Sequence, residues 1–141
     1  MPSFKHLVTK LQTDFPSVDF VAGERYTFHP PNQVIFDARH PDQLSLLHEL
    51  GHFLIKAHDY QYDVELLRIE SAAWAKAAEL ANDYHVAWNE DNIQDHLDSY
   101  RDWLHQVSLC PNCQLSGYQD TTGCYHCPLC EHEWQRNLLP E

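Results

Sequence analysis

Two histidines and a glutamate stand together in the segment His48-Glu49-Leu50-Gly51-His52. On a helix, residues four apart differ by about 40° in direction and about 6 Å in height, so the imidazoles of His48 and His52 can bind one metal ion. Glu49 points about 100° away from His48 and can approach a water on that metal without binding the metal itself. This spacing is typical of hydrolytic zinc sites, in which the carboxylate takes a proton from zinc-bound water.

The same residues can also be interpreted as ordinary core histidines, because the chain has 11 histidines and a five-residue pattern can arise by chance. The character of residues 41–57 favours the metal-binding interpretation over that of core histidines. This segment is predicted to form a helix that is apolar around most of its circumference and therefore buried, where a histidine without a partner is costly. A mid-helix glycine costs about 1 kcal/mol relative to alanine, so Gly51 predicts close approach by another segment.

A second group of metal ligands lies near the C-terminus, in Cys110-Pro-Asn-Cys113 and Cys127-Pro-Leu-Cys130. Two C-x-x-C pairs at this spacing predict a zinc ribbon, whose four thiolates close the coordination shell and make the zinc structural. Disulfides are the alternative, which the odd total of five cysteines disfavours. Cys124 is left over. It or His126 could replace one ligand, but the symmetry of the two pairs favours the four cysteines.

The residues around these cysteines bear on the ribbon's turns and on its role. Zinc ribbons commonly carry glycine after the second cysteine of each pair. Gln114 and Glu131 hold these places here, which predicts less regular turns. Asp120, Glu131 and Glu133 outweigh the lone Arg136, so we expect a folding staple or a protein-docking surface rather than a nucleic-acid site.

The pattern of apolar residues predicts four helices, at residues 3–13, 41–57, 64–82 and 91–107. Ser3 and Asp91 are the predicted N-caps of the first and last helices. Pro41 is predicted in the first helical turn of its segment. Trp74, on the third helix, is expected to pack in the core.

Short β-prone runs at 18–21, 26–28 and 34–36 predict a small antiparallel sheet of two or three strands. The predicted fold class is therefore α+β, with this sheet packed on a helical zincin core and a C-terminal four-cysteine zinc ribbon. We expect two domains, a zincin-like metallopeptidase domain at 1–108 and the ribbon module with its tail at 109–141.

Composition limits the partners of the chain. The net charge of −12, with only 9 lysines and arginines, argues against nucleic-acid binding as its role. No apolar stretch has the length of a signal peptide core or of a membrane span. We therefore expect a cytoplasmic protein, and a reducing compartment favours metal binding by cysteine over disulfides.

The helix motif, preceded by Leu-Ser-Leu-Leu and by the β-rich segment 26–37, resembles the ImmA/IrrE-type metallopeptidases of the gluzincin group. The resemblance covers residues 25–82. It implies that a glutamate on the following helix completes the zinc site, within a Glu-x-x-Ala-Asn-like motif. Glu70-Ser71-Ala72-Ala73-Trp74 matches this motif except at Trp74, which replaces the Asn-like residue. The implied zinc ligands are His48, His52 and Glu70.

The activity implied is hydrolysis of a peptide bond in a protein or peptide substrate. A zinc ion with three protein ligands and an open position lowers the pKa of its water towards about 7. Glu49 would act as general base and then deliver the proton to the leaving amine. In gluzincins the substrate usually pairs with an edge strand, which by resemblance comes from residues 25–36. Five side chains are candidate oxyanion donors: Tyr60, Tyr62, Tyr84, His58 and His85.

Two other residues could complete the site. His58 satisfies the metzincin spacing, but that arrangement needs a sharp turn where the chain has β-branched Ile55. If the helix continues, His58 faces about 240° away from His52. Glu65 is a weaker alternative on the same predicted helix as Glu70.

Two other functions compete with the metallopeptidase. One is a catalytically weak zinc protein that binds a partner through the ribbon. The presence of Glu49 argues against this function, because a binding protein does not need a carboxylate between the two histidines. The other is a protease that resembles the SprT type, whose members also join this helix motif to a C-terminal zinc ribbon. Those complete the site with a histidine, and the acidic charge fits their DNA association poorly.

Overall fold

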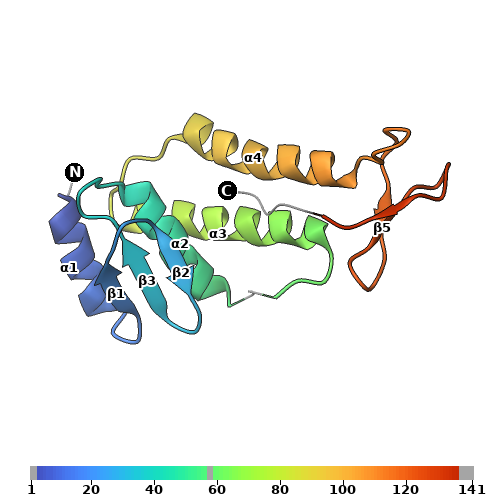
Figure 1. Cartoon of the computed structure of the whole chain (residues 1–141). Coiled ribbons are helices and arrows are strands. Elements are labelled where there is room, and N and C mark those ends of the chain that lie inside the picture. The colour runs from blue at the N-terminus through green and yellow to red at the C-terminus, as the bar shows by residue number, and fades with distance from the viewer. Residues whose placement is uncertain (1–2, 57–58, 137–141) are drawn as a thin grey trace. The chain divides into compact units, whose positions relative to one another are not determined.

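The computed structural model of the chain describes residues 3–56 and 59–136, which form four helices and two three-stranded sheets (Figure 1). The predicted α+β class is confirmed. The chain divides into two compact units, one of Met1–His58 with Glu70–Asn89 and one of Asp59–Ile69 with Glu90–Glu141. The sequence predicts a boundary after residue 108, and in the structure residues 59–69 and 90–108 group with residues 109–141.

In unit 1, α1 (Phe4–Asp14) packs against the first strand of the sheet. The hydroxyl of Ser3 accepts a hydrogen bond from His6 N–H at 3.1 Å, so Ser3 is the N-cap as predicted. Leu7, Val8 and Leu11 are buried at helical spacing. The amphipathic pattern of this segment therefore fixes which side of α1 faces the core.

The sheet of unit 1 contains β1 (Asp19–Ala22), β2 (Thr27–His29) and β3 (Gln33–Phe36), in the order β1-β3-β2. β2 pairs antiparallel with β3, but β1 pairs parallel with it. The prediction of an antiparallel sheet was therefore wrong for β1. β3 holds the most buried positions, with Val34 at 0% and Phe36 at 8% exposure, so it takes the centre and separates β1 from β2.

Helix α2 (Gln43–Ile55) packs against β2 and β3. The carboxylate of Asp42 accepts hydrogen bonds from the N–H and hydroxyl of Ser45 and caps the helix. Pro41 therefore precedes the N-cap, and its predicted place in the first turn was wrong. The helix ends at Ile55, and its C-cap residue Lys56 has a left-handed φ of 55°.

The core of unit 1 lies along α2 and α3 (Asp63–Asp83), of which the part from Glu70 onwards belongs to this unit. Three leucines of α2 are fully buried: Leu46, Leu47 and Leu50. Small Ala73 and Ala77 of α3 are also fully buried. The motif helix is therefore buried along one side, whereas the sequence predicted burial around most of its circumference.

Unit 2 contains the start of α3, the helix α4 (Glu90–Ser108) and the ribbon strands. Because α4 begins at Glu90, Asp91 lies inside its first turn and is not the predicted N-cap. The strands β4 (Tyr118–Gln119), β5 (Tyr125–His126) and β6 (Glu133–Trp134) form an antiparallel sheet in sequence order.

A buried carboxylate joins the ribbon to the start of α3 within unit 2. Asp63 is 1% exposed and accepts hydrogen bonds from the hydroxyl of Tyr125, at 2.7 Å, and from the guanidinium of Arg136. Its backbone N–H donates to Gln119 Oε1 at 2.7 Å. Both the charge and the amide of Asp63 are thereby satisfied, as burial requires.

No helix within residues 3–56 and 59–136 is both long enough and apolar enough to cross a membrane.

Candidate metal centres

The first candidate centre lies on α2, where the helix brings His48 and His52 onto the same side. Their ring centroids are 4.7 Å apart, and each side chain is 13% exposed. Donor atoms of His48, Glu49 and His52 all lie within 4.8 Å of one another, so this group could hold a metal ion. The helical spacing of the sequence motif explains this convergence.

Glu70 reaches the same point from α3. Each of its two carboxylate oxygens faces one histidine, with Oε2 2.8 Å from His48 Nε2 and Oε1 3.0 Å from His52 Nε2. Glu70 is 6% exposed, although it is a charged residue. The structure thus brings together the three residues that the resemblance implied, from two helices that are 22 residues apart along the chain at His48 and Glu70.

Neither of the two alternative third ligands, Glu65 and His58, is found at this point in the described structure. The carboxylate of Glu65 accepts a hydrogen bond from the backbone N–H of Tyr62 at 2.9 Å, and so caps the start of α3 in unit 2. His58 lies outside the described residues.

Gly51 allows α2 and α3 to approach closely. A Cβ atom built on Gly51 would lie only 2.5 Å from the backbone oxygen of Ala73, a distance that real side chains do not tolerate. Ala73 is three residues after Glu70, on the turn that follows it. The prediction that Gly51 marks the approach of another segment is confirmed, and that segment carries Glu70.

Burial and charge set the protonation of this group. Burial opposes ionisation of Glu70, but hydrogen bonds from His48 and His52 outweigh it and lower its pKa to about 2. Burial also opposes the charged form of His52, yet the hydrogen bond and charge of Glu70 leave the pKa of His52 raised. For Glu49, burial raises the pKa above its ordinary value, although both histidines counteract it. Such a carboxyl is suited to holding a proton during a reaction.

Trp74 covers the ring of His48. The two rings are stacked, with centroids 4.0 Å apart and planes inclined by 3°. Trp74 is 4% exposed, which confirms the prediction that it packs in the core. Its contact with a candidate ligand was not predicted. The signal was its position four residues after Glu70, because residues at this spacing lie on one side of a helix.

The donor atoms fit a divalent metal. Two imidazole nitrogens and one carboxylate converge here, and this is the protein ligand set found at zinc sites that keep an open position. The carboxylate of Glu70 is ionised and buried, so it would meet a cation without first losing a proton.

The second candidate centre comprises the four cysteines of the two C-x-x-C pairs. The sulfur atoms all lie within 4.8 Å of one another, and Cys113 Sγ is 3.2 Å from Cys127 Sγ. Cys110 and Cys127 are buried at 0% and 3% exposure. The backbone N–H of Cys130 donates to Cys127 Sγ at 3.5 Å and lowers the pKa of this thiol to about 6. The cluster can therefore supply thiolates to a metal ion.

The turns at both cysteine pairs are regular, contrary to prediction. Gln114 and Glu131 adopt left-handed φ values of 60° and 63°. Their backbone N–H groups donate to the carbonyls of Cys110 and Cys127, at 2.8 and 3.2 Å. The two turns thus take the same form without glycine, because converging the cysteines requires this backbone.

Cys124 and His126 do not belong to the four-cysteine group. They lie with Asp120, and the donor atoms of these three residues are within 4.8 Å of one another. Sequence reasoning noted the first two only as substitute ligands and missed Asp120, which precedes them in the turn between β4 and β5.

Of the candidate oxyanion donors, the four that the structure describes are not singled out by their contacts, and His58 lies outside the described residues. The hydroxyl of Tyr84 donates to Asp14 Oδ2 at 2.6 Å, and His85 is exposed with a left-handed φ of 59°. Tyr60 accepts a hydrogen bond from Arg136 within unit 2, and Tyr62 also belongs to that unit.

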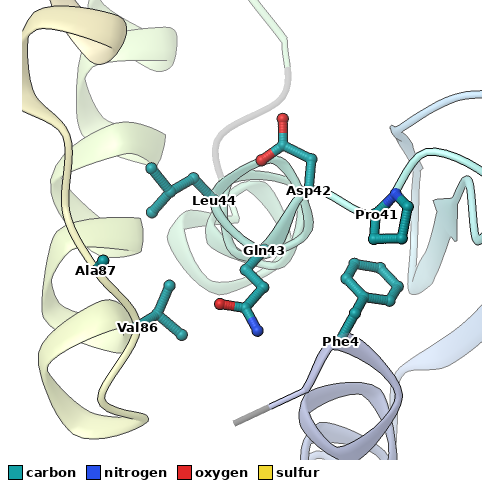
Figure 2. A pocket seen from close by; sticks show the side chains of 7 residues that line it. All are labelled: Phe4, Pro41, Asp42, Gln43, Leu44, Val86 and Ala87. Atoms are coloured by element: carbon teal, nitrogen blue, oxygen red, sulfur yellow. The ribbon is translucent and has the colours of Figure 1, made fainter. Parts of the chain in front are cut away.

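A pocket at the N-terminal end of α2 lies apart from the candidate ligands (Figure 2). Its lining comes from α1, the start of α2 and the segment after α3: Phe4, Pro41, Asp42, Gln43, Leu44, Val86 and Ala87. The carboxylate of Asp42 is already used as the helix cap. The pocket therefore offers no free acidic or basic group for catalysis.

Comparisons with protein-family models, with curated proteins and with solved structures find no match to this chain.

Proposed function

We propose that the chain is a zinc-dependent metallopeptidase. The observation that supports this most strongly is the convergence of His48 Nε2 and His52 Nε2 on the two oxygens of Glu70, at 2.8 and 3.0 Å. Glu49 adds a second carboxylate beside the first, with Oε1 3.6 Å from His48 Nδ1. A purely structural site would not need this extra carboxylate, whereas hydrolysis needs a base.

Zinc is the proposed metal at both centres. Imidazole and carboxylate donors in a three-ligand set suit catalytic zinc, and four thiolates suit structural zinc. In the proposal, His48, His52 and Glu70 hold the catalytic ion. Cys110, Cys113, Cys127 and Cys130 hold the structural ion.

The mechanism follows from the positions of the side chains. When bound, zinc supplies a Lewis acid that lowers the pKa of a water and polarises the substrate carbonyl. Glu49 accepts the proton as the water oxygen attacks the carbonyl carbon, and then gives that proton to the departing amine as the C–N bond breaks. Its raised pKa suits both steps. Glu70 stays ionised throughout, because its pKa is near 2.

The proposed substrate is a protein or peptide in an extended conformation. β2 (Thr27–His29) is an edge strand and packs against α2, the helix that carries His48 and His52. An edge strand presents unpaired backbone groups to which an extended chain can hydrogen-bond. Nucleic acid is not proposed as a substrate, since the net charge is −12.

A second candidate function is binding of a protein partner through the ribbon. The ribbon exposes Tyr118 at 57% and Leu129 at 69%, and Leu129 lies between two of the clustered cysteines. Exposed apolar side chains on a rigid turn are suited to a protein contact. In this case the metal at His48 would be structural and Glu49 would be dispensable.

The ligand set is tested by three alanine variants: Glu70→Ala, His58→Ala and Glu65→Ala. We expect Glu70→Ala alone to lose one zinc per chain and all hydrolysis, while the other two keep both. Glu65→Ala is the matched control, because it removes a carboxylate from the same helix. Loss of the catalytic zinc in His58→Ala but not in Glu70→Ala would overturn the proposed site.

A further inference from the structure

A third cluster of side chains that could hold a metal ion lies in the ribbon, in the turn between β4 and β5 and in β5 itself. Asp120 Oδ, Cys124 Sγ and a ring nitrogen of His126 all lie within 4.8 Å of one another. We propose that these three residues form an additional metal site, separate from the four cysteines and from the His48 centre. The proposal does not depend on the peptidase activity.

The turn itself positions Asp120. The backbone N–H of Asp120 donates to Cys124 O at 2.8 Å and closes the turn, in which Gly123 supplies a φ of 91°. Asp120 Oδ1 accepts hydrogen bonds from the N–H and hydroxyl of Thr122 and from the N–H of Cys124. One carboxylate oxygen therefore fixes the side chain, while the other, Oδ2, faces His126 Nε2 at 2.6 Å.

His126 is held from both sides. Its ring stacks on that of Tyr118, with centroids 5.3 Å apart and planes inclined by 17°. Its second nitrogen, Nδ1, lies 3.5 Å from Glu133 Oε1 on β6. A metal-binding histidine commonly directs its other nitrogen to a carboxylate, which orients the ring and raises its basicity. Glu133 lies beside Nδ1 of His126 at an ion-pair distance rather than at a hydrogen-bond distance.

Cys124 completes the set from the end of the turn. It directly precedes β5 and stands two residues before His126, and its Sγ lies within 4.8 Å of the donor atoms of Asp120 and His126. Among the described residues, its sulfur has polar contacts with two carbonyl oxygens, at 3.6 Å to Tyr125 O and 3.7 Å to Trp134 O. The thiol is therefore not committed to a strong hydrogen bond and can turn to a metal.

The charge around the cluster attracts a cation. Asp120 and Glu133 are both acidic, and within the described residues their ion pairs are with His126 alone. The one lysine or arginine in residues 109–136 is Arg136, which pairs with Asp63. A divalent metal would compensate these two carboxylates, which have no lysine or arginine partner among the described residues.

The donors define the metal that fits. One sulfur, one nitrogen and one oxygen suit a borderline transition metal such as Zn²⁺ rather than Mg²⁺ or Ca²⁺, which prefer oxygen. Three protein donors leave a position open, so this ion should exchange more readily than one held by four thiolates.

The test is equilibrium dialysis of the full chain against buffered free Zn²⁺, with bound zinc counted by elemental analysis. We expect wild type to reach three zinc ions per chain at saturation, and Cys124→Ser and Asp120→Asn to reach only two. His132→Gln is the control, because it removes a ribbon histidine outside the cluster, and it should reach three. Co²⁺ absorption adds an independent readout, since Cys124→Ser should remove part of the thiolate charge-transfer band.

A wild-type chain that saturates at two zinc ions, while Glu70→Ala saturates at one, would overturn the additional site, because both wild-type ions would then be accounted for by the His48 centre and the four cysteines. A third ion that persists in Cys124→Ser or in Asp120→Asn would also overturn it. If the His48 centre did not bind zinc, wild type and the three ribbon variants would each bind one zinc ion fewer than expected. The difference of one ion between wild type and Cys124→Ser would remain.

Discussion

The indole of Trp74 lies parallel to the imidazole of His48, with ring centroids 4.0 Å apart and an interplanar angle of 3°. The indole covers one face of a proposed metal ligand and leaves the ring edge, with Nε2, directed at Glu70. The nearest carboxylate to Nδ1 among the described residues is Glu49, at 3.6 Å, which exceeds hydrogen-bonding distance. Stacking on Trp74 and the hydrogen bond between Nε2 and Glu70 therefore orient His48 together, without a carboxylate partner for Nδ1.

We predict that Trp74→Leu weakens zinc binding at the His48 centre by about 10- to 100-fold, the usual cost of removing a group that orients a ligand. Trp74→Phe, which keeps a flat ring, should lose less. Competition with a chelator of known affinity measures the effect. Trp88→Leu is the control, because Trp88 touches the edge of Trp74, at 6.3 Å between centroids. Equal losses in Trp74→Leu and Trp88→Leu would show a general packing effect instead.

Gly51→Ala should destabilise unit 1 by about 1–3 kcal/mol, the usual cost of adding a methyl group to a packed contact. The added Cβ would meet the backbone oxygen of Ala73, which cannot rotate away as a side chain could. Urea unfolding measures the change.

Ala75→Gly supplies the comparison for Gly51→Ala, because Ala75 is exposed on α3. It should cost about 1 kcal/mol from helix propensity alone. If propensity also decided the outcome at position 51, Gly51→Ala would stabilise the protein by a similar amount. That result would contradict the close approach of the two helices.

Cys110→Ser and Cys127→Ser should each lose the structural zinc and lower the melting temperature, because a site of four thiolates contributes its binding free energy to folding. Both sulfurs are buried, so little solvent can replace the missing ligand. Cys124→Ser is the matched control and should keep this zinc. Unchanged melting temperatures in Cys110→Ser and Cys127→Ser would count against a structural ion.

We predict that the carboxylate of Asp37 makes a pH-dependent contribution to the free energy of unfolding. A hydrogen bond from His40, at 2.9 Å, followed by hydrogen bonds from Arg39, lowers the pKa of Asp37 below its ordinary value. A lowered folded-state pKa stabilises the protein above the unfolded pKa of about 3.9, and this contribution is lost as the pH falls through the folded value. Asp37→Asn should therefore be less stable than wild type at pH 6, and the difference should shrink towards pH 3. A difference independent of pH, measured by urea unfolding, would exclude this contribution.

The local elements could be predicted from the sequence because their signals are local. The apolar spacing of residues 4–14 and the cap at Ser3 specify a helix without reference to the rest of the chain. The strands were also predicted, but their order was not. Whether β3 or β2 takes the centre depends on which strand buries more surface, and that is a property of the packed unit.

The site residues divide in the same way. The spacing of His48 and His52 is a property of one helix, so their proximity could be predicted. The stacking of Trp74 on His48 depends on how α3 approaches α2, and Asp120 joins Cys124 and His126 only through the turn that Gly123 allows. At Gln114 and Glu131 the packed structure overrides the local preference of the sequence. Closure of the cysteine cluster gives both residues a left-handed backbone, at a cost of about 1 kcal/mol each.

The central claim is that Glu49 transfers the proton during peptide hydrolysis, and Glu49→Gln tests it most directly. The substitution keeps the size of the side chain and leaves His48, His52 and Glu70 in place, so we expect unchanged zinc content and an unchanged melting temperature. Wild type and Glu49→Gln would each be incubated with a proteome, and the new peptide termini would be compared by mass spectrometry. The account predicts cleavage products with wild type that are absent with Glu49→Gln. Equal cleavage by the two proteins, with zinc bound in both, would contradict it.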